Sequence, residues 1–213
     1  MLGQTVLHAL VTGAHTAEAR EAARLLAALA SDATSPPWAS PLVAWWVGSA
    51  GPAESLEVAL ARITPRADRA APYAEALRTG VRGLAVLAEH DSARARDLLA
   101  TTYATRRDHG LFAPWVFPPH ARFSLELARL ALAVGDLPDA ERHLQDLFGG
   151  FFVRYPYLGE AFELRAKIAE QRADTTTAIR AYGAFIALWQ DADAQLQPRV
   201  AAARAALARL EGR

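Results

Sequence analysis

The residues best suited to chemistry in this chain are its six histidines and a pair of aspartates near one end. The histidines are scattered, at positions 8, 15, 90, 109, 120 and 143. No two are three or four positions apart, the spacing that places two imidazoles on one helix face to bind a metal ion. Asp191 and Asp193 have the spacing of the first ligands in an EF-hand calcium loop. That loop also needs a glycine and a later glutamate, but positions 196 and 202 hold leucine and alanine. We therefore expect no metal site, and we expect the aspartates to cap a helix.

The motifs of the common enzyme classes are missing from the sequence. There is no glycine-rich dinucleotide fingerprint, Walker loop, zinc-protease helix motif or nucleophile elbow. The absence of cysteine excludes thiol nucleophiles, thiolate metal ligands and disulfides. Asp108, His109 and some of the arginines are residue types found in hydrolytic sites, but any chain of this length contains such a set. We expect a non-catalytic protein without a cofactor.

The charge balance argues against nucleic acid or anionic lipid as the partner. Basic and acidic residues number 23 each, and nearly all the basic ones are arginine, with Lys167 the single lysine. A nucleic-acid binder usually carries a basic stripe, and none is evident. No run approaches the 18 or more apolar residues of a membrane span, and the first residues lack the basic charge of a secretory signal. The sequence favours a cytoplasmic location, with a periplasmic or membrane-peripheral one left open.

Three aromatic stretches are the candidate contacts for a partner. They comprise Trp45 and Trp46; Phe112, Trp115 and Phe117; and Phe151, Phe152, Tyr155 and Tyr157. The last two stretches lie in connectors without helical periodicity, and loops this aromatic must bury apolar surface somewhere. Either they fold back as lids over the protein's own core, or they form an exposed patch for another protein. Trp45 and Trp46 present a similar choice, because adjacent residues on a helix point about 100° apart.

Helical periodicity dominates the elements that must position these residues. Apolar residues recur at helical spacing in about eleven segments, which form five antiparallel pairs plus one. The best-defined segments are 16–31, 40–49, 70–89, 92–107, 120–134, 137–148, 158–172 and 175–190. A final helix is expected after Asp193, with one apolar stripe of Leu196, Val200, Ala203, Leu207 and Leu210.

A turn that ends in aspartate occurs three times in the sequence. Each time it lies between two small residues twelve positions apart. Gly83 and Ala95 flank His90-Asp91, Ala128 and Ala140 flank Gly135-Asp136, and Ala166 and Ala178 flank Ala173-Asp174. Small residues where two helices of a hairpin cross allow their axes to approach closely. The larger residues Leu99, Leu144 and Tyr182, four positions further on, would fill the gap to the next unit.

This pattern resembles the tetratricopeptide repeat, most closely in the stretches 128–140 and 166–178. The segment 181–198 is similar to the C-terminal end of bacterial multi-domain tetratricopeptide proteins, some of which carry a kinase or DNA-binding domain. The resemblance covers about 75–213 and is weak before it. The spacing from Ala95 to Ala140 is 45 residues and from Ala140 to Ala178 is 38, against 34 in the standard repeat. The array is therefore degenerate, and the longest spacing contains the first aromatic connector.

The sequence thus predicts an all-α fold, an α-solenoid of about five antiparallel helical hairpins with a C-terminal capping helix. We expect one tetratricopeptide-like domain over 1–213, with degenerate repeats in 1–66, better-formed repeats in 67–194 and the capping helix in 195–213. The resemblance implies a protein-interaction scaffold or a peripheral subunit of a larger assembly, including a multi-subunit or membrane-associated complex. The alternative is a regulatory or sensor module derived from a larger bacterial signalling protein.

Overall fold

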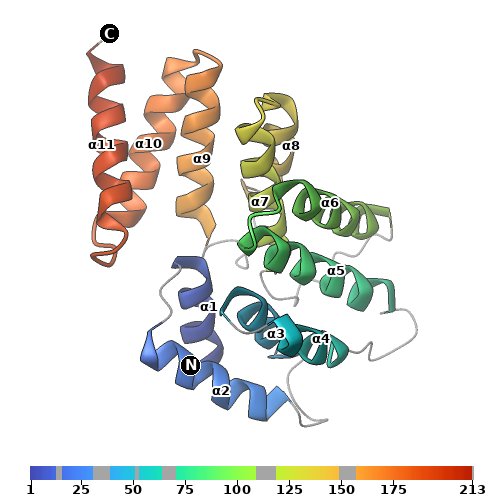
Figure 1. Cartoon of the computed structure of the whole chain (residues 1–213). Coiled ribbons are helices and arrows are strands. Elements are labelled where there is room, and N and C mark those ends of the chain that lie inside the picture. Colours follow the sequence, from blue (N-terminus) through green and yellow to red (C-terminus); the bar gives the residue numbers. More distant parts are fainter. Residues whose placement is uncertain are drawn as a thin grey trace. The chain divides into compact units, whose positions relative to one another are not determined.

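The computed structural model describes residues 1–12, 16–30, 39–50, 53–63, 71–108, 119–148 and 157–212. All regular elements in these ranges are α-helices, eleven in number (Figure 1). They are α1 (Leu2–Thr12), α2 (Ala17–Ala30), α3 (Ala39–Ala50), α4 (Ala53–Ala61), α5 (Ala71–Ala88), α6 (Ser92–Asp108), α7 (Pro119–Ala133), α8 (Leu137–Phe148), α9 (Leu158–Gln171), α10 (Thr175–Trp189) and α11 (Gln197–Glu211). The all-α prediction is confirmed for the described residues, and the predicted helix bounds agree closely with the observed ones.

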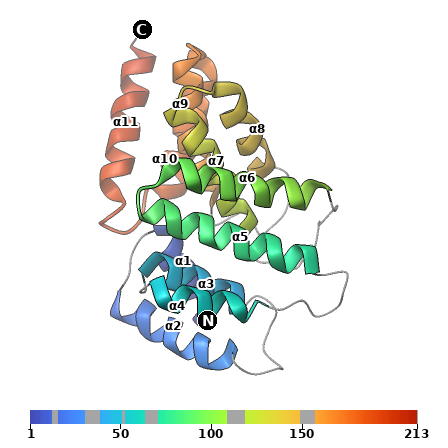
Figure 2. The same ribbon diagram turned by 45° about the vertical axis from the view of Figure 1, so that its right-hand side comes forward.

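The helices pack as neighbouring pairs, and the chain divides into two compact units. The first unit is Met1–Phe123 and the second is Ser124–Arg213. In the first unit α1 packs on α2, α3 on α4 and α5 on α6, and the last of these pairs lies side by side in both ribbon views (Figure 2). In the second unit α8 packs on α9, α9 on α10 and α10 on α11. These contacts agree with an array of helical hairpins; the expectation of one repeat domain stays a prediction.

The three aspartate turns predicted from the sequence have the same hydrogen-bonding pattern. The amides of Asp91, Asp136 and Asp174 donate to the carbonyls five residues earlier, at 3.2, 2.9 and 2.9 Å. The residue before each aspartate has a positive φ, of 68° at His90, 77° at Gly135 and 58° at Ala173. These are the features of a Schellman turn, in which a left-handed residue ends one helix.

The same aspartates then begin the next helix of each hairpin. Each carboxylate accepts a hydrogen bond from the backbone amide three residues later, at 3.0 Å for Asp91, 3.2 Å for Asp136 and 3.0 Å for Asp174. A side-chain oxygen in this position satisfies one of the free amides of the first helical turn. One aspartate with its preceding residue therefore ends one helix and starts the next, which explains why the motif recurs.

The small residues that flank these turns lie where the helices of a hairpin meet. Ala95, Ala128, Ala140, Ala166 and Ala178 have no exposed surface. A Cβ added to Gly83 would lie 2.9 Å from the Cγ of Leu99, so α5 and α6 approach too closely for a larger side chain. The predicted reason for the spacing, close approach of paired helices, is confirmed for α5 and α6, and the full burial of the alanines in the other two hairpins agrees with it.

The core of the second unit lies between α9, α10 and α11. It contains Ala166 and Ala169 of α9, Phe185 of α10, and Val200 and Leu210 of α11. Val200, Ala203 and Leu210 of the predicted apolar stripe belong to this core, and Leu207 packs against it partly buried. Leu196 immediately precedes α11 and lies outside this cluster. Because the contacts are apolar and many are alanine, the three helices pack closely with little side-chain volume between them.

Candidate functional site

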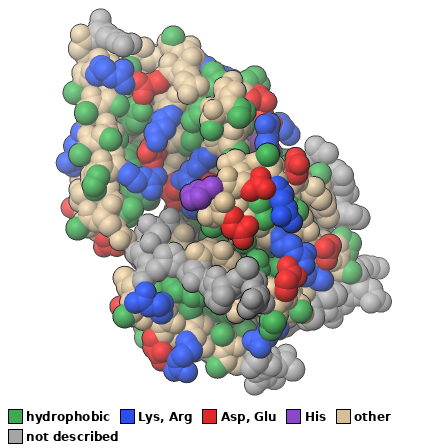
Figure 3. Space-filling model, in the orientation of Figure 1, with side chains coloured by type: hydrophobic (Ala, Val, Ile, Leu, Met, Phe, Trp, Pro, Cys, Tyr) green, Lys and Arg blue, Asp and Glu red, His purple; other side chains and the backbone are tan. Residues whose placement is uncertain are grey.

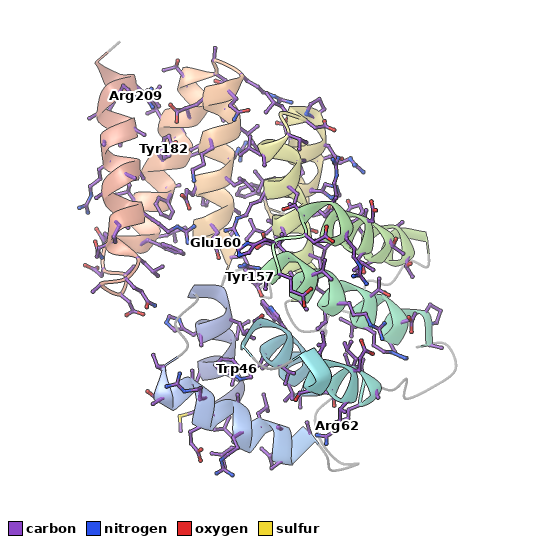
Figure 4. The ribbon with its side chains drawn as sticks, viewed as in Figure 1. Trp46, Arg62, Tyr157, Glu160, Tyr182 and Arg209 are labelled. Carbon is purple, nitrogen blue, oxygen red and sulfur yellow. The ribbon has the colours of Figure 1, made fainter. Side chains whose placement is uncertain are left out.

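Three of the aromatic residues predicted from the sequence lie within the described residues. Trp45 on α3 is 2% exposed. Its neighbour Trp46, labelled in Figure 4, is half-buried. Tyr157, immediately before α9, has no exposed surface. Trp45 and Tyr157 thus present almost no surface to a partner in this conformation, whereas Trp46 remains partly accessible. The others, Phe112, Trp115, Phe117, Phe151, Phe152 and Tyr155, lie outside the described residues.

Sequence reasoning missed a charged face on α9 that connects three helices of the second unit. Glu160, Glu163, Lys167 and Glu170 are three or four positions apart and so share one side of α9. Glu160 is 2% exposed and forms ion pairs with Arg129 of α7 and, at 3.6 Å, with Arg199 of α11. Burial of such a carboxylate is tolerated only with charged partners of good geometry. The spacing of these charges in the sequence was the signal that could have revealed the face.

Glu163, one turn further along α9, joins two cations. Lys167 Nζ lies 2.7 Å from one carboxylate oxygen, and the Nε of Arg199 donates to the other at 3.1 Å. Burial by itself raises the pKa of Glu163, but the hydrogen bonds from Lys167 and Arg199 outweigh it and hold the pKa below its ordinary value. The carboxylate is therefore kept charged, and it ties α11 to α9 across 36 residues of sequence.

Glu170 ends this charged face with a second set of partners. Tyr182 of α10 donates its hydroxyl hydrogen to Glu170 at 2.6 Å, and Arg209 of α11 lies 2.5 Å from the other oxygen (Figure 4). Burial, together with the hydrogen bond to Glu170, raises the pKa of Tyr182 well above its usual range. The tyrosine therefore stays protonated and acts as a hydrogen-bond donor. These contacts fix how the last three helices pack against one another.

A groove on the second unit is the best candidate for a binding site. It runs between α8 and α10 over α9 and has a volume of about 260 Å³. Its apolar floor is formed by Leu144, Ile168 and Ala169, which are 2 to 4% exposed. Phe148 forms part of the wall and packs against Phe162, with 5.0 Å between ring centroids. An accessible hollow with an apolar floor and charged edges is the usual form of a recognition site.

The edge of this groove carries two arginines and two carboxylates. Arg172 forms an ion pair with Glu141 across the α8–α9 pair. Asp174 accepts from the Thr177 amide as the cap of α10. Hydrogen bonds from the side chain and then the backbone of Thr177 lower the pKa of the Asp174 carboxyl. The guanidinium of Arg165 lies over the Phe148 ring, 5.0 Å from its centroid. The groove can therefore hold an apolar group and orient a charge beside it.

The structure offers no metal centre among the described residues, because no three histidine or acidic side chains there converge on one point. Within the same ranges no helix has the length and hydropathy needed to cross a bilayer. Arginine side chains lie among aspartates and glutamates over the face drawn in Figure 3, instead of gathering into a patch of one sign.

Comparison with known proteins leaves the chain without a family. No protein-family model, no curated protein and no solved structure matches it. The described residues form an all-helical protein whose consecutive helices are packed in pairs. The resemblance to the tetratricopeptide repeat stays a prediction.

Proposed function

We propose that this chain is a tetratricopeptide-like solenoid that binds other proteins, as a non-catalytic scaffold or a peripheral subunit of a larger assembly. The observation that carries the proposal is the recurrence of one hairpin design at Asp91, Asp136 and Asp174. Stacked hairpins of this kind contact only their neighbours and leave extended surfaces and grooves between units, which suit the binding of another chain. The groove between α8 and α10 is one such surface.

The charge distribution supports a protein partner over a nucleic acid. The formal net charge is zero, and the ion pairs of the second unit neutralise its buried carboxylates internally. Nucleic-acid binding gains its affinity largely from many unneutralised cations along one face. Protein interfaces instead combine an apolar centre with a mixed polar rim, the composition of the α8–α10 groove.

The test is cross-linking of the chain in the cells that express it, followed by reconstitution of any captured complex from purified proteins. We expect at least one partner to form a complex of fixed stoichiometry that survives gel filtration. A scaffold function would be refuted if no partner is cross-linked to the chain in the cells and the purified chain elutes alone with every candidate partner. In the same assay, the double substitution Trp115→Ala and Phe117→Ala tests the sequence-based prediction that the first aromatic connector makes the contact.

A further inference from the structure

The lining of the α8–α10 groove includes an arginine, Arg165, that forms no ion pair with the described residues. Arg165 is exposed, and its guanidinium stacks on Phe148. Asp174 is close enough for the positive charge of Arg165 to act on its carboxyl. Among the described residues, however, no carboxylate lies within ion-pair distance of Arg165. Its N–H donors are thus available at the edge of an apolar hollow.

The two carboxylates that line the groove already have partners. Glu141 pairs with Arg172, and Asp174 is held by the first turn of α10. A cationic ligand would have to displace one of these interactions and would also meet the like charge of Arg165. An anionic ligand would displace neither interaction. It would meet the like charges of Glu141 and Asp174, but Glu141 is paired with Arg172, and Asp174 lies within the electrostatic reach of both Arg180 and Arg165. Stacking on an aromatic ring leaves the edge of a guanidinium able to donate to a carboxylate. The charges of the groove therefore favour an acidic occupant.

The size of the groove restricts what fills its apolar floor. Its volume of about 260 Å³ lies below the roughly 300–1,000 Å³ typical of drug-sized ligand and cofactor pockets. It suits one large apolar side chain, resting on Leu144, Ile168 and Ala169. Such a side chain would contact the ring of Phe148 at the wall.

We propose that this groove binds an acidic segment of a partner protein, with one apolar side chain seated on its floor and an adjacent carboxylate paired to Arg165. This inference rests on the proposed function and adds the chemistry of the partner. The guanidinium of Arg165 lies over the ring of Phe148, and both side chains line the groove, so the apolar and charged contacts can be made together. A segment that lacks the apolar side chain or the carboxylate makes only one of these two contacts.

The experiment measures binding of three nine-residue peptides with a serine-glycine background. Each has a central phenylalanine followed by two glutamates, two glutamines or two lysines. Amide resonances of the ¹⁵N-labelled protein report the site, and fluorescence anisotropy reports the affinity. We expect saturable shifts at Leu144, Ile168 and Ala169, with the glutamate peptide bound about three- to tenfold more tightly than the lysine peptide, as for a part-exposed ion pair.

Two variants and one control separate recognition from folding. Arg165→Glu should reverse the order of the peptides, a result that loss of structure cannot produce. Gln145→Trp, at an exposed lining position, should fill the groove and abolish the shifts. Arg204→Glu makes the same charge change at an exposed position of α11 and should leave every affinity unchanged. Circular dichroism of all three variants confirms that they are folded.

Equal affinity for the three peptides, or no shifts at the groove at millimolar peptide, would overturn the proposal. A captured partner whose binding is unaffected by Arg165→Glu and Gln145→Trp would also overturn it, while leaving the proposed function intact. Conversely, binding of the glutamate peptide by a chain that forms no complex with any protein would sustain the chemistry of the groove and refute the scaffold function.

Discussion

Replacement of Gly135 by alanine should destabilise the second unit, although nothing near it obstructs a larger side chain. Gly135 has a φ of 77°, and an added Cβ would meet no atom within 4 Å. The cost is therefore confined to the backbone. An L-residue in the left-handed region costs about 1–2 kcal/mol, and alanine recovers about 0.5–1 kcal/mol because it loses less conformational entropy than glycine on folding. Taken at the centres of these two ranges, the net loss in the free energy of unfolding is about 0.7 kcal/mol.

The equivalent turn before Asp174 permits the reverse substitution. Ala173 occupies the same position with a φ of 58°, so Ala173→Gly should raise the free energy of unfolding by about 0.5–1 kcal/mol. Gly183 supplies the matched control, because it also has open space around its Cβ position but lies inside helix α10. There alanine is the better helix former, and Gly183→Ala should stabilise the unit by about 0.8–1 kcal/mol.

Urea unfolding, followed through the amide resonances of Ala166 and Phe185, measures these changes within the second unit alone. Both probes are placed in the second unit because a chain of two compact units need not unfold in a single two-state step. The same glycine-to-alanine change should thus have opposite signs at positions 135 and 183. The reasoning fails if Gly135→Ala is neutral or stabilising while Gly183→Ala behaves as expected.

Two further predictions concern contacts of the second unit. Gly159→Ala would bring a Cβ within 2.1 Å of the Nε1 of Trp189, so it should destabilise the unit by about 1–3 kcal/mol in the same urea assay; an unchanged midpoint would show that the Trp189 ring moves aside freely. Glu163→Gln should cost about 1–3 kcal/mol near neutral pH, since charged hydrogen bonds to Lys167 and Arg199 are lost. The pKa of Glu163 is lowered in the folded state, so its stabilisation is present above the unfolded pKa of about 4.3 and disappears as the pH falls through the folded value. Urea midpoints measured from pH 7 to pH 3 should therefore converge for the variant and the natural protein, and a gap that stays constant would contradict this role.

The features that the sequence predicted well depend on residues close to one another in the chain. Asp136 ends one helix and caps the next through partners no more than five residues away. The recurrence of apolar residues every three or four positions is equally local, so helices such as α8 and α10 were predicted within a residue of their observed bounds. The small residues twelve apart signalled which helices pair, because one short turn leaves a hairpin few other arrangements.

Contacts between distant residues required the folded structure. Glu160 pairs with Arg129, 31 residues away, and Arg199 reaches Glu163 over 36. The sequence contains many arginines and glutamates, and only the packing of the helices determines which of them meet. Aromatic residues show the same dependence, since Tyr157 is fully buried and Trp46 is only partly buried, although both lie in similarly apolar stretches.

By itself, then, the sequence determined the helices, their turns and their pairing into hairpins, because hydrogen bonds and periodicity act within a few residues. Tertiary structure decided the ion pairs along α9 and the groove over Leu144 and Ile168, which is assembled from three separate helices. The position of Arg165 beside that groove follows from the same packing. Within the described ranges Arg165 has no carboxylate at ion-pair distance, whereas Glu160, Glu163 and Glu170 of α9 are each paired with a cation.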